Sequence, residues 1–188
     1  YGAWASPLSA VAIARQGLRL GPVAVDGADV YWLEGRPGEG GRDVLVRRRA
    51  DGSTADMVPA DHNVRTRVHE YGGGPFVVDA GQVFYQNFSD QRIYRTDGSS
   101  APVPLTPAGP WRYADAVVDR SRARLIVVRE DHSVEGQEPV STLVAVSVRG
   151  DGTFDAGTVL VSGADFYSTP RLSADGTRLC WLSWNRPN

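Results

Sequence analysis

The chain has 188 residues, 41% of them hydrophobic, and a formal net charge of -2 at pH 7. Its length suits one domain with a single core. Its net charge argues against a nucleic-acid partner, which would favour a basic face. Its single cysteine, Cys180, excludes a disulfide framework and favours a reducing compartment. Because it has no signal-peptide pattern and no apolar run of about 18 residues, we expect a cytoplasmic protein that does not engage a membrane.

The N-terminal segment, residues 1–17, contains the only helix that the pattern predicts. Ser9 suits the first position because its hydroxyl can accept a hydrogen bond from a free amide of the first turn. Gly17 suits the left-handed position at the end. The helix between them, at 9–16, has about two turns. Such a short helix must dock on the first strands or on a further domain.

From Leu18 onward, short apolar runs alternate with Asp, Gly and Ser turns, which is typical of an all-β chain. Four hairpins repeat along residues 18–188, and a repeat of about 40–50 residues with several strands indicates propeller blades. The hairpin strands are expected at 23–25 with 30–33, 76–78 with 83–85, 116–118 with 125–128, and 171–173 with 179–182. Two further strands fit after each of the first three hairpins, at 44–47 and 54–57, 92–95 and 102–105, and 143–148 and 158–161.

The fold class predicted from this pattern is a partial β-propeller of about three and a half four-stranded blades. The blades are expected at approximately 18–60, 72–108, 112–163 and 166–188, the last one incomplete. Because propellers close at four to eight blades, the terminal blades should leave aromatic faces bare, Trp32 at one end and Trp181 and Trp184 at the other. We therefore expect a fragment of a longer protein, which forms a homo-oligomer through open strand edges or pairs with a missing half.

Between the first two predicted blades, residues 63–75 read Asn-Val-Arg-Thr-Arg-Val-His-Glu-Tyr-Gly-Gly-Gly-Pro. Consecutive glycines are tolerated where the backbone takes a positive φ or approaches another group closely. This stretch is therefore expected to be a loop with a geometric role. With the segment that follows the next hairpin, it supplies the candidate site residues Arg65, Arg67, His69, Glu70, Tyr71, Asp90 and Arg92.

Residues 68–74, with 63–67 before them and 87–92 after them, resemble the N-terminal propeller of bacterial prolyl-oligopeptidase-type serine peptidases. The subgroup is that of acylaminoacyl-peptidase and dipeptidyl-aminopeptidase-like enzymes. Further matches lie at 1–4, 32–37, 129–132, 162–167 and 170–185, so the resemblance covers nearly the whole chain. It implies a lid that admits short peptides to a C-terminal α/β-hydrolase domain, with the N-terminal helix at the junction of the two domains.

The hydrolase half that the resemblance implies is absent from this sequence, which contains no Gly-x-Ser-x-Gly nucleophile turn. The chain is therefore expected to contain no catalytic residue and to be inactive alone. Its expected role is to gate and position peptides for a peptidase that removes acyl, aminoacyl or dipeptidyl residues. The peptide substrate would reach the chain through the missing domain, and no cofactor is expected.

Two interpretations of the candidate residues stay open. His69 and Glu70 suit acid–base chemistry or capture of a peptide terminus, or else they hold a crossover between blades. Arg65 and Arg67 are two apart and face the same side of an extended segment. They suit a clamp for a carboxylate of the substrate or of the missing domain, or else a solvated or inter-blade ion pair.

The spacing of the histidines and the single cysteine gives no metal-site pattern, so no metal is expected. Two other functions compete with the peptidase lid. One is a free-standing module that binds proteins through its open strand edges. The other is a glycosidase or lyase that uses Glu70 and Asp90 as its carboxylate pair.

Overall fold

The computed structural model describes residues 9–10, 17–150, 152 and 154–187. The helix predicted at 9–16, and with it most of the 1–17 segment, lies outside the described residues. Within the described part, no helix is long and apolar enough to cross a bilayer. The elements that follow are strands and two short 3-10 turns, at Pro37–Glu39 and Arg120–Arg122.

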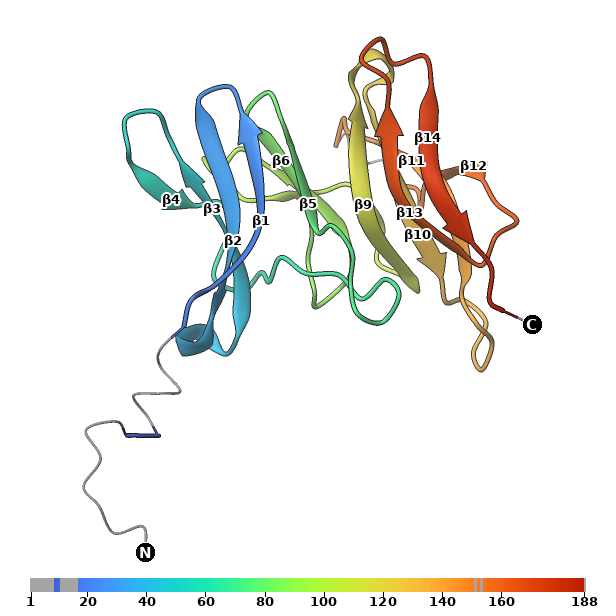
Figure 1. The fold of residues 1–188 in the computed structure, drawn as a ribbon, viewed down its shortest axis with the longest axis horizontal. Helices are drawn as coiled ribbons and strands as arrows, with labels where there is room; N and C mark the ends of the chain where they lie inside the picture. The colour runs from blue at the N-terminus through green and yellow to red at the C-terminus, as the bar shows by residue number, and fades with distance from the viewer. Residues whose placement is uncertain (1–8, 11–16, 151, 153, 188) are drawn as a thin grey trace, which may run out of the picture.

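The described residues form four antiparallel sheets, each built from strands that follow one another in the chain. Figure 1 shows them side by side like the vanes of a fan, in chain order from blue to red. The first sheet contains β1 (Arg19–Asp26), β2 (Asp29–Arg36), β3 (Arg42–Arg48) and β4 (Thr54–Asp56). The second contains β5 (Phe76–Asp79), β6 (Gln82–Gln86), β7 (Ile93–Thr96) and β8 (Val103–Pro104).

The third sheet contains β9 (Trp111–Asp119), β10 (Arg124–Asp131), β11 (Val140–Ser147) and β12 (Thr158–Val161). The fourth has two strands in the described residues, β13 (Phe166–Leu172) and β14 (Leu179–Trp184). The prediction of an all-β chain with three and a half four-stranded units is confirmed. Contacts join β1 to β5, β5 to β9 and β9 to β13, so the first strands of successive sheets lie next to one another.

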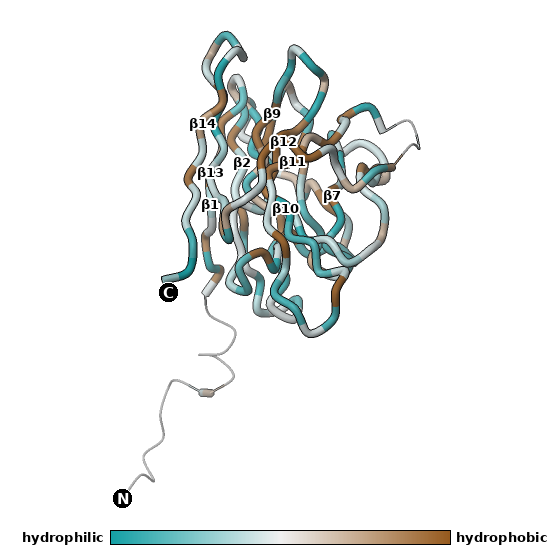
Figure 2. The backbone as a smooth tube through the Cα atoms, turned by 90° about the vertical axis from the view of Figure 1, so that its right-hand side faces the viewer, coloured by the Kyte–Doolittle hydropathy of each residue, from teal (hydrophilic) through white to brown (hydrophobic). Residues whose placement is uncertain are grey.

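Apolar side chains fill the spaces between neighbouring sheets. On β6, successive side chains point to opposite faces, so Val83 and Tyr85 join the core shared with the first sheet, whereas Phe84 joins the core shared with the third. A third core cluster contains Val68, residues of the third sheet and Tyr167 of the fourth. Burial on both faces explains why strands in the middle of a sheet, such as β6, are nearly continuous apolar runs. Figure 2 shows hydrophobic residues concentrated along the strands and hydrophilic residues at the loops.

The turns after the first strands also connect neighbouring sheets. The Asp26 carboxylate accepts a hydrogen bond of 2.6 Å from the Gly81 amide. The Arg120 guanidinium likewise donates to Asp79 at 2.6 Å, and Arg122 donates to the Gly176 carbonyl at 3.2 Å. The sheets are therefore joined at their turns as well as through their cores.

The two terminal sheets expose apolar side chains, but one prediction about them is wrong. On β14, Trp181 and Trp184 are 37% and 42% exposed, as expected. Trp32 is instead half-buried against the first core cluster, and its indole N–H donates to Glu34 at 3.0 Å. The exposed apolar surface at that end is aliphatic and belongs to β1, where Leu20 and Val25 are 71% and 69% exposed.

Candidate functional site

Residues 63–75, here called the 63–75 loop, run from the first sheet to the second and also contact the third. The Val64 amide donates to the Asp43 carbonyl at 2.8 Å, and the Arg65 amide donates to the Gln86 carbonyl at 3.1 Å. The buried hydroxyl of Thr66 donates to the Tyr113 carbonyl at 2.6 Å. Three sheets therefore fix the path of the loop.

The glycines of the loop fit against β9. Gly72 has a φ of 93°, which favours glycine. A Cβ on Gly73 would lie 2.9 Å from the Cβ of Ala114, and one on Gly74 would lie 2.9 Å from the Asp115 carboxylate. The glycine run thus combines a positive φ with a close approach, which is the geometric role that the sequence indicates.

Asp115 joins this loop to the fourth sheet. Its Oδ1 accepts a hydrogen bond of 2.5 Å from the Gly74 amide, and its Oδ2 accepts one of 3.0 Å from the Thr169 amide. Asp115 and Thr169 both have positive φ values, 56° and 53°. They lie where β9 and β13 shift register against β10 and β14. The bulge in β9 and the bulge in β13 therefore direct the Asp115 carboxylate and the Thr169 amide toward each other.

The side chain of His69 is only 6% exposed, and its partners come from the third and fourth sheets. Its amide donates to Glu130 Oε1 at 2.8 Å, and its ring Nε2 lies 3.1 Å from the Tyr167 carbonyl oxygen. Because a carbonyl only accepts, Nε2 carries the proton of this hydrogen bond. Nδ1 lies 3.6 Å from Glu130 Oε1, and Glu130 Oε2 lies 3.1 Å from the ring of His132. Glu130 therefore sits between two histidines.

Glu70 points away from this buried group. Its side chain is 82% exposed and accepts a 2.6 Å hydrogen bond from Arg112. The Arg112 guanidinium lowers the pKa of Glu70, which makes this carboxylate a weak base. His69 and Glu70 have positive φ values, 57° and 64°, and separate partners. The geometry does not form an acid–base pair from these two residues.

Arg65 and Arg67 lie on the same side of the loop, as their spacing predicts. Their guanidinium carbons lie 5.0 and 4.4 Å from the centre of the Phe88 ring, and both residues are exposed. The Arg67 amide donates to the side chain of Gln91 at 2.9 Å. The 63–75 loop and the turn after β6 therefore form one surface.

Asp90 and Arg92 belong to that turn. One oxygen of Asp90 accepts a 2.6 Å hydrogen bond from the Tyr94 hydroxyl, and the other lies 3.2 Å from the Arg92 amide. Burial and this carboxylate raise the pKa of Tyr94 to about 12. Arg92 donates to the Thr106 carbonyl at 2.7 Å. Both residues hold the turn, and Asp90 shows the bonding to nearby backbone that is common for aspartate in turns.

Tyr71 is 79% exposed and borders a cleft of about 430 Å3 beneath the glycines. At one wall of the cleft, Arg19 and Asp43 form an ion pair of 2.6 Å. The cleft is lined by Arg19, Pro22, Leu33, Asp43, Val64, Arg65, Thr66, Tyr71, Gly72, Gly73 and Pro75. Seven residues of the 63–75 loop, among them the candidates Arg65 and Tyr71, thus line one concave surface.

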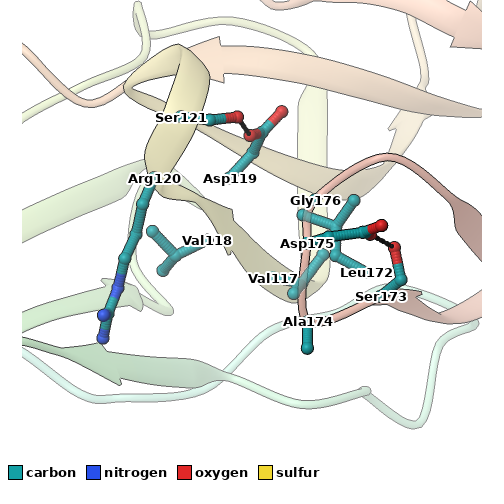
Figure 3. A pocket seen from close by; sticks show the side chains of 10 residues that line it. All are labelled: Val117, Val118, Asp119, Arg120, Ser121, Leu172, Ser173, Ala174, Asp175 and Gly176. Carbon is teal, nitrogen blue, oxygen red and sulfur yellow. Dashed lines mark hydrogen bonds between the residues drawn. The ribbon is translucent and has the colours of Figure 1, made fainter.

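A second cleft, of about 350 Å3, lies at the turns after β9 and β13 (Figure 3). Its polar groups are engaged in the turns, since Ser121 donates to Asp119 and Ser173 donates to Asp175. Asp119 is also paired with Arg124 at 2.9 Å. None of the candidate residues lines this cleft, so the 63–75 loop is the better candidate site.

Three groups on which the loop depends were not among the candidate site residues. Asp115, Arg112 and Glu130 each lie more than forty residues beyond their loop partners. Two signals for them were available in the sequence. Asp115 is an acidic residue inside an otherwise apolar strand, and Glu130 is an acidic residue at the end of an apolar run. Among the described residues, no group of three or more histidine, cysteine or acidic side chains is placed to hold a metal ion.

Stacked antiparallel sheets whose first strands lie side by side define a propeller-like protein, with the candidate site on a loop between its first two units. No protein-family model and no curated protein matches the chain. Solved structures do match it. Over its full length, the chain is 38% identical to a puromycin-hydrolysing peptidase of Mycobacterium tuberculosis, with a TM-score of 0.87.

Two structures of puromycin hydrolase, one of them a variant in a complex, match at 37% identity with TM-scores of 0.90 and 0.89. The chain spans 31% of the length of each of these three peptidases. A chain of a nidogen–laminin complex, 18% identical with a TM-score of 0.54, shows the fold alone. The resemblance to prolyl-oligopeptidase-type peptidases is confirmed, since the chain is similar throughout to a propeller portion of puromycin hydrolases.

Proposed function

We propose that this chain is the gating and substrate-positioning portion of a serine peptidase that removes acyl, aminoacyl or dipeptidyl residues from short peptides. The observation that carries the proposal is the match of the whole chain to 31% of each puromycin-hydrolysing peptidase, at 37–38% identity. The catalytic α/β-hydrolase domain lies outside these 188 residues, and the chain is inactive alone. The lone exposed Cys180 supports a cytoplasmic setting.

The geometry of the 63–75 loop supports a positioning role. The loop is fixed to β9 through Gly74 and to β10 through His69, so its backbone is rigid. Its exposed side chains, Arg65, Arg67 and Tyr71, are presented on that rigid support beside a cleft. Rigid support is what a site needs to hold a ligand in one orientation.

The proposal includes closure of the sheets into a ring with further blades of a longer chain. The exposed apolar residues on β1 and β14 support it, because burying a large apolar side chain stabilises a protein by about 1.5–3 kcal/mol. Leu20, Val25 and Leu182, each more than 60% exposed, would be covered by further sheets.

The test is to read the coding sequence beyond residue 188 and to produce both the longer protein and the 188-residue chain. Each is then assayed for hydrolysis of puromycin and of aminoacyl p-nitroanilides. We expect a Gly-x-Ser-x-Gly turn followed by Asp and His, with hydrolysis by the longer protein and none by the 188-residue chain. A continuation of several hundred residues without such a turn, or hydrolysis by the chain alone, contradicts the proposal.

A second candidate function is a free-standing binding module that forms a homo-oligomer through open strand edges. The exposed face of β14 favours it, because Leu182 is 62% exposed beside two exposed tryptophans. Light scattering after size exclusion should show a dimer or a larger species, and Leu182→Glu should return the monomer. Val140, also 62% exposed but on β11, supplies the matched control Val140→Glu. A monomeric wild-type chain excludes the self-association.

A further inference from the structure

Arg65 and Arg67 have no acidic partner among the residues that the structure describes. Within the described residues, no ion pair involves either guanidinium, whereas Arg112, Arg120 and Arg124 each hold a carboxylate. The Phe88 ring holds both groups instead, with guanidinium carbons 5.0 and 4.4 Å from its centre. Their N–H groups remain available to a ligand.

The neighbouring acids are already engaged. The Arg112 guanidinium, and to a smaller extent the charge of Arg67, lowers the pKa of Glu70. The Glu70 carboxylate accepts its hydrogen bond from Arg112, at 2.6 Å. Asp43, on the wall of the cleft, is paired with Arg19. Asp90 accepts the hydroxyl of its turn tyrosine. The chain therefore places two like charges beside one ring, and no acidic side chain of the described residues forms an ion pair with either of them.

The chemistry of these groups selects the ligand. A guanidinium presents a planar fork of N–H donors that matches a carboxylate with two parallel hydrogen bonds. Stacking on an aromatic ring fixes the orientation of the fork, so less freedom is lost when the ligand binds. Two such forks on one surface form a receptor for a carboxylate.

The cleft beside Arg65 provides room for the remainder of a ligand. It measures about 430 Å3, which suits a small molecule, and Arg65 stands at its border with the exposed Tyr71. The backbone of Gly72 and Gly73 forms part of its wall. A short extended peptide can thus place its chain along the cleft and its terminal carboxylate at the arginines.

We propose that Arg65 and Arg67, held by Phe88, bind the C-terminal carboxylate of a short peptide whose preceding residues lie in the cleft of the 63–75 loop. This inference rests on the proposed positioning role and names the part of the substrate that the loop recognises. The site selects peptides with a free C-terminus and rejects those whose terminus is blocked or still joined to a longer chain.

The experiment is calorimetric titration of the 188-residue chain with trialanine and with trialanine amide at low ionic strength. We expect the acid to bind at least about tenfold more tightly than the amide, because only the acid makes charge-assisted hydrogen bonds. Arg65→Gln and Arg67→Gln should each remove most of this difference. Arg49→Gln, which removes an exposed arginine outside the loop, should leave it unchanged. Added sodium chloride should weaken the binding.

Equal affinities for acid and amide, no binding of either peptide, or an unchanged preference in both loop variants would overturn the inference. Inorganic phosphate serves as a third probe. If phosphate binds as tightly as trialanine and depends on the same two arginines, the site is a general anion site and the inference is overturned. Thermal unfolding of each variant verifies that the fold is intact. The result is separable from the proposed function, because a nucleophile turn beyond residue 188 stands or falls independently of these affinities.

Discussion

Asp115 offers the sharpest test of how the 63–75 loop is held, through the variant Asp115→Asn. The wild-type carboxylate accepts two backbone hydrogen bonds, at 2.5 Å from Gly74 and at 3.0 Å from Thr169. An asparagine keeps one acceptor and places an NH2 group opposite the other amide. It also tolerates the positive φ of 56° at this position, so backbone strain does not enter the comparison.

Hydrogen bonds to charged groups stabilise proteins by about 1.5–3 kcal/mol each. Losing one of the two should therefore lower the free energy of unfolding by about 1.5–3 kcal/mol. Asp115→Ala loses both and adds the strain of a positive φ, so it should be destabilised further. The two variants thus have a predicted order as well as a predicted size.

Urea unfolding followed by tryptophan fluorescence measures these differences, with Asp61→Asn as a control at an exposed aspartate. The control should unfold within about 0.5 kcal/mol of the wild type, as is usual for surface substitutions. If Asp115→Asn also unfolds within that margin, or if it is destabilised more than Asp115→Ala, the bridging role assigned to this carboxylate is wrong.

Three further predictions follow from the geometry. Gly74→Ala should be destabilised by about 1–3 kcal/mol, because its Cβ would lie 2.9 Å from a carboxylate oxygen, whereas Gly38→Ala places its Cβ in open space and serves as the control in the same thermal unfolding assay. Burial opposes ionisation of Asp119, but hydrogen bonds from Arg124 and its neighbours hold its pKa below the ordinary value. The contribution of Asp119 to stability is therefore present above about pH 4 and is lost as the pH falls through the folded pKa. The stability difference between wild type and Asp119→Asn, measured by urea unfolding, should shrink below about pH 4. A difference that stays constant with pH would contradict this. Glu70→Gln should shift the urea midpoint less than Asp115→Asn or Asp119→Asn does at neutral pH, since the side chain is 82% exposed, and a larger shift would show that its ion pair is not solvated.

Much of the sheet architecture could be predicted because it is encoded locally. The hairpin of β5 and β6 closes through Ala80 and Gly81, both with positive φ, and the sequence marks that turn by its Asp-Ala-Gly. The alternation of Val83, Phe84 and Tyr85 places neighbouring residues in two different cores, which produces a recognisable apolar run. Such signals involve residues only a few positions apart.

The partners of the candidate site could not be predicted, because each comes from a distant strand. Nothing near His69 indicates that Glu130 and Tyr167 will surround it, since that depends on how the third and fourth sheets stack. The misplaced expectation for Trp32 has a similar origin. Its ring packs on the first core cluster, and β1 takes the exposed position at that end. Both outcomes are decided by tertiary packing.

The 63–75 loop has a consequence for the order in which the protein assembles. Each sheet is built from consecutive hairpins, which form early because their contacts are close in sequence. The hydrogen bond from His69 to Tyr167 instead spans 98 positions, and closing so long a segment carries an entropy cost that local pairing avoids. During synthesis on the ribosome, the loop cannot reach its final shape until β13 has emerged. The part of the candidate site around His69 is therefore completed late in folding, and a nascent chain interrupted before that strand lacks the Tyr167 carbonyl to which His69 donates.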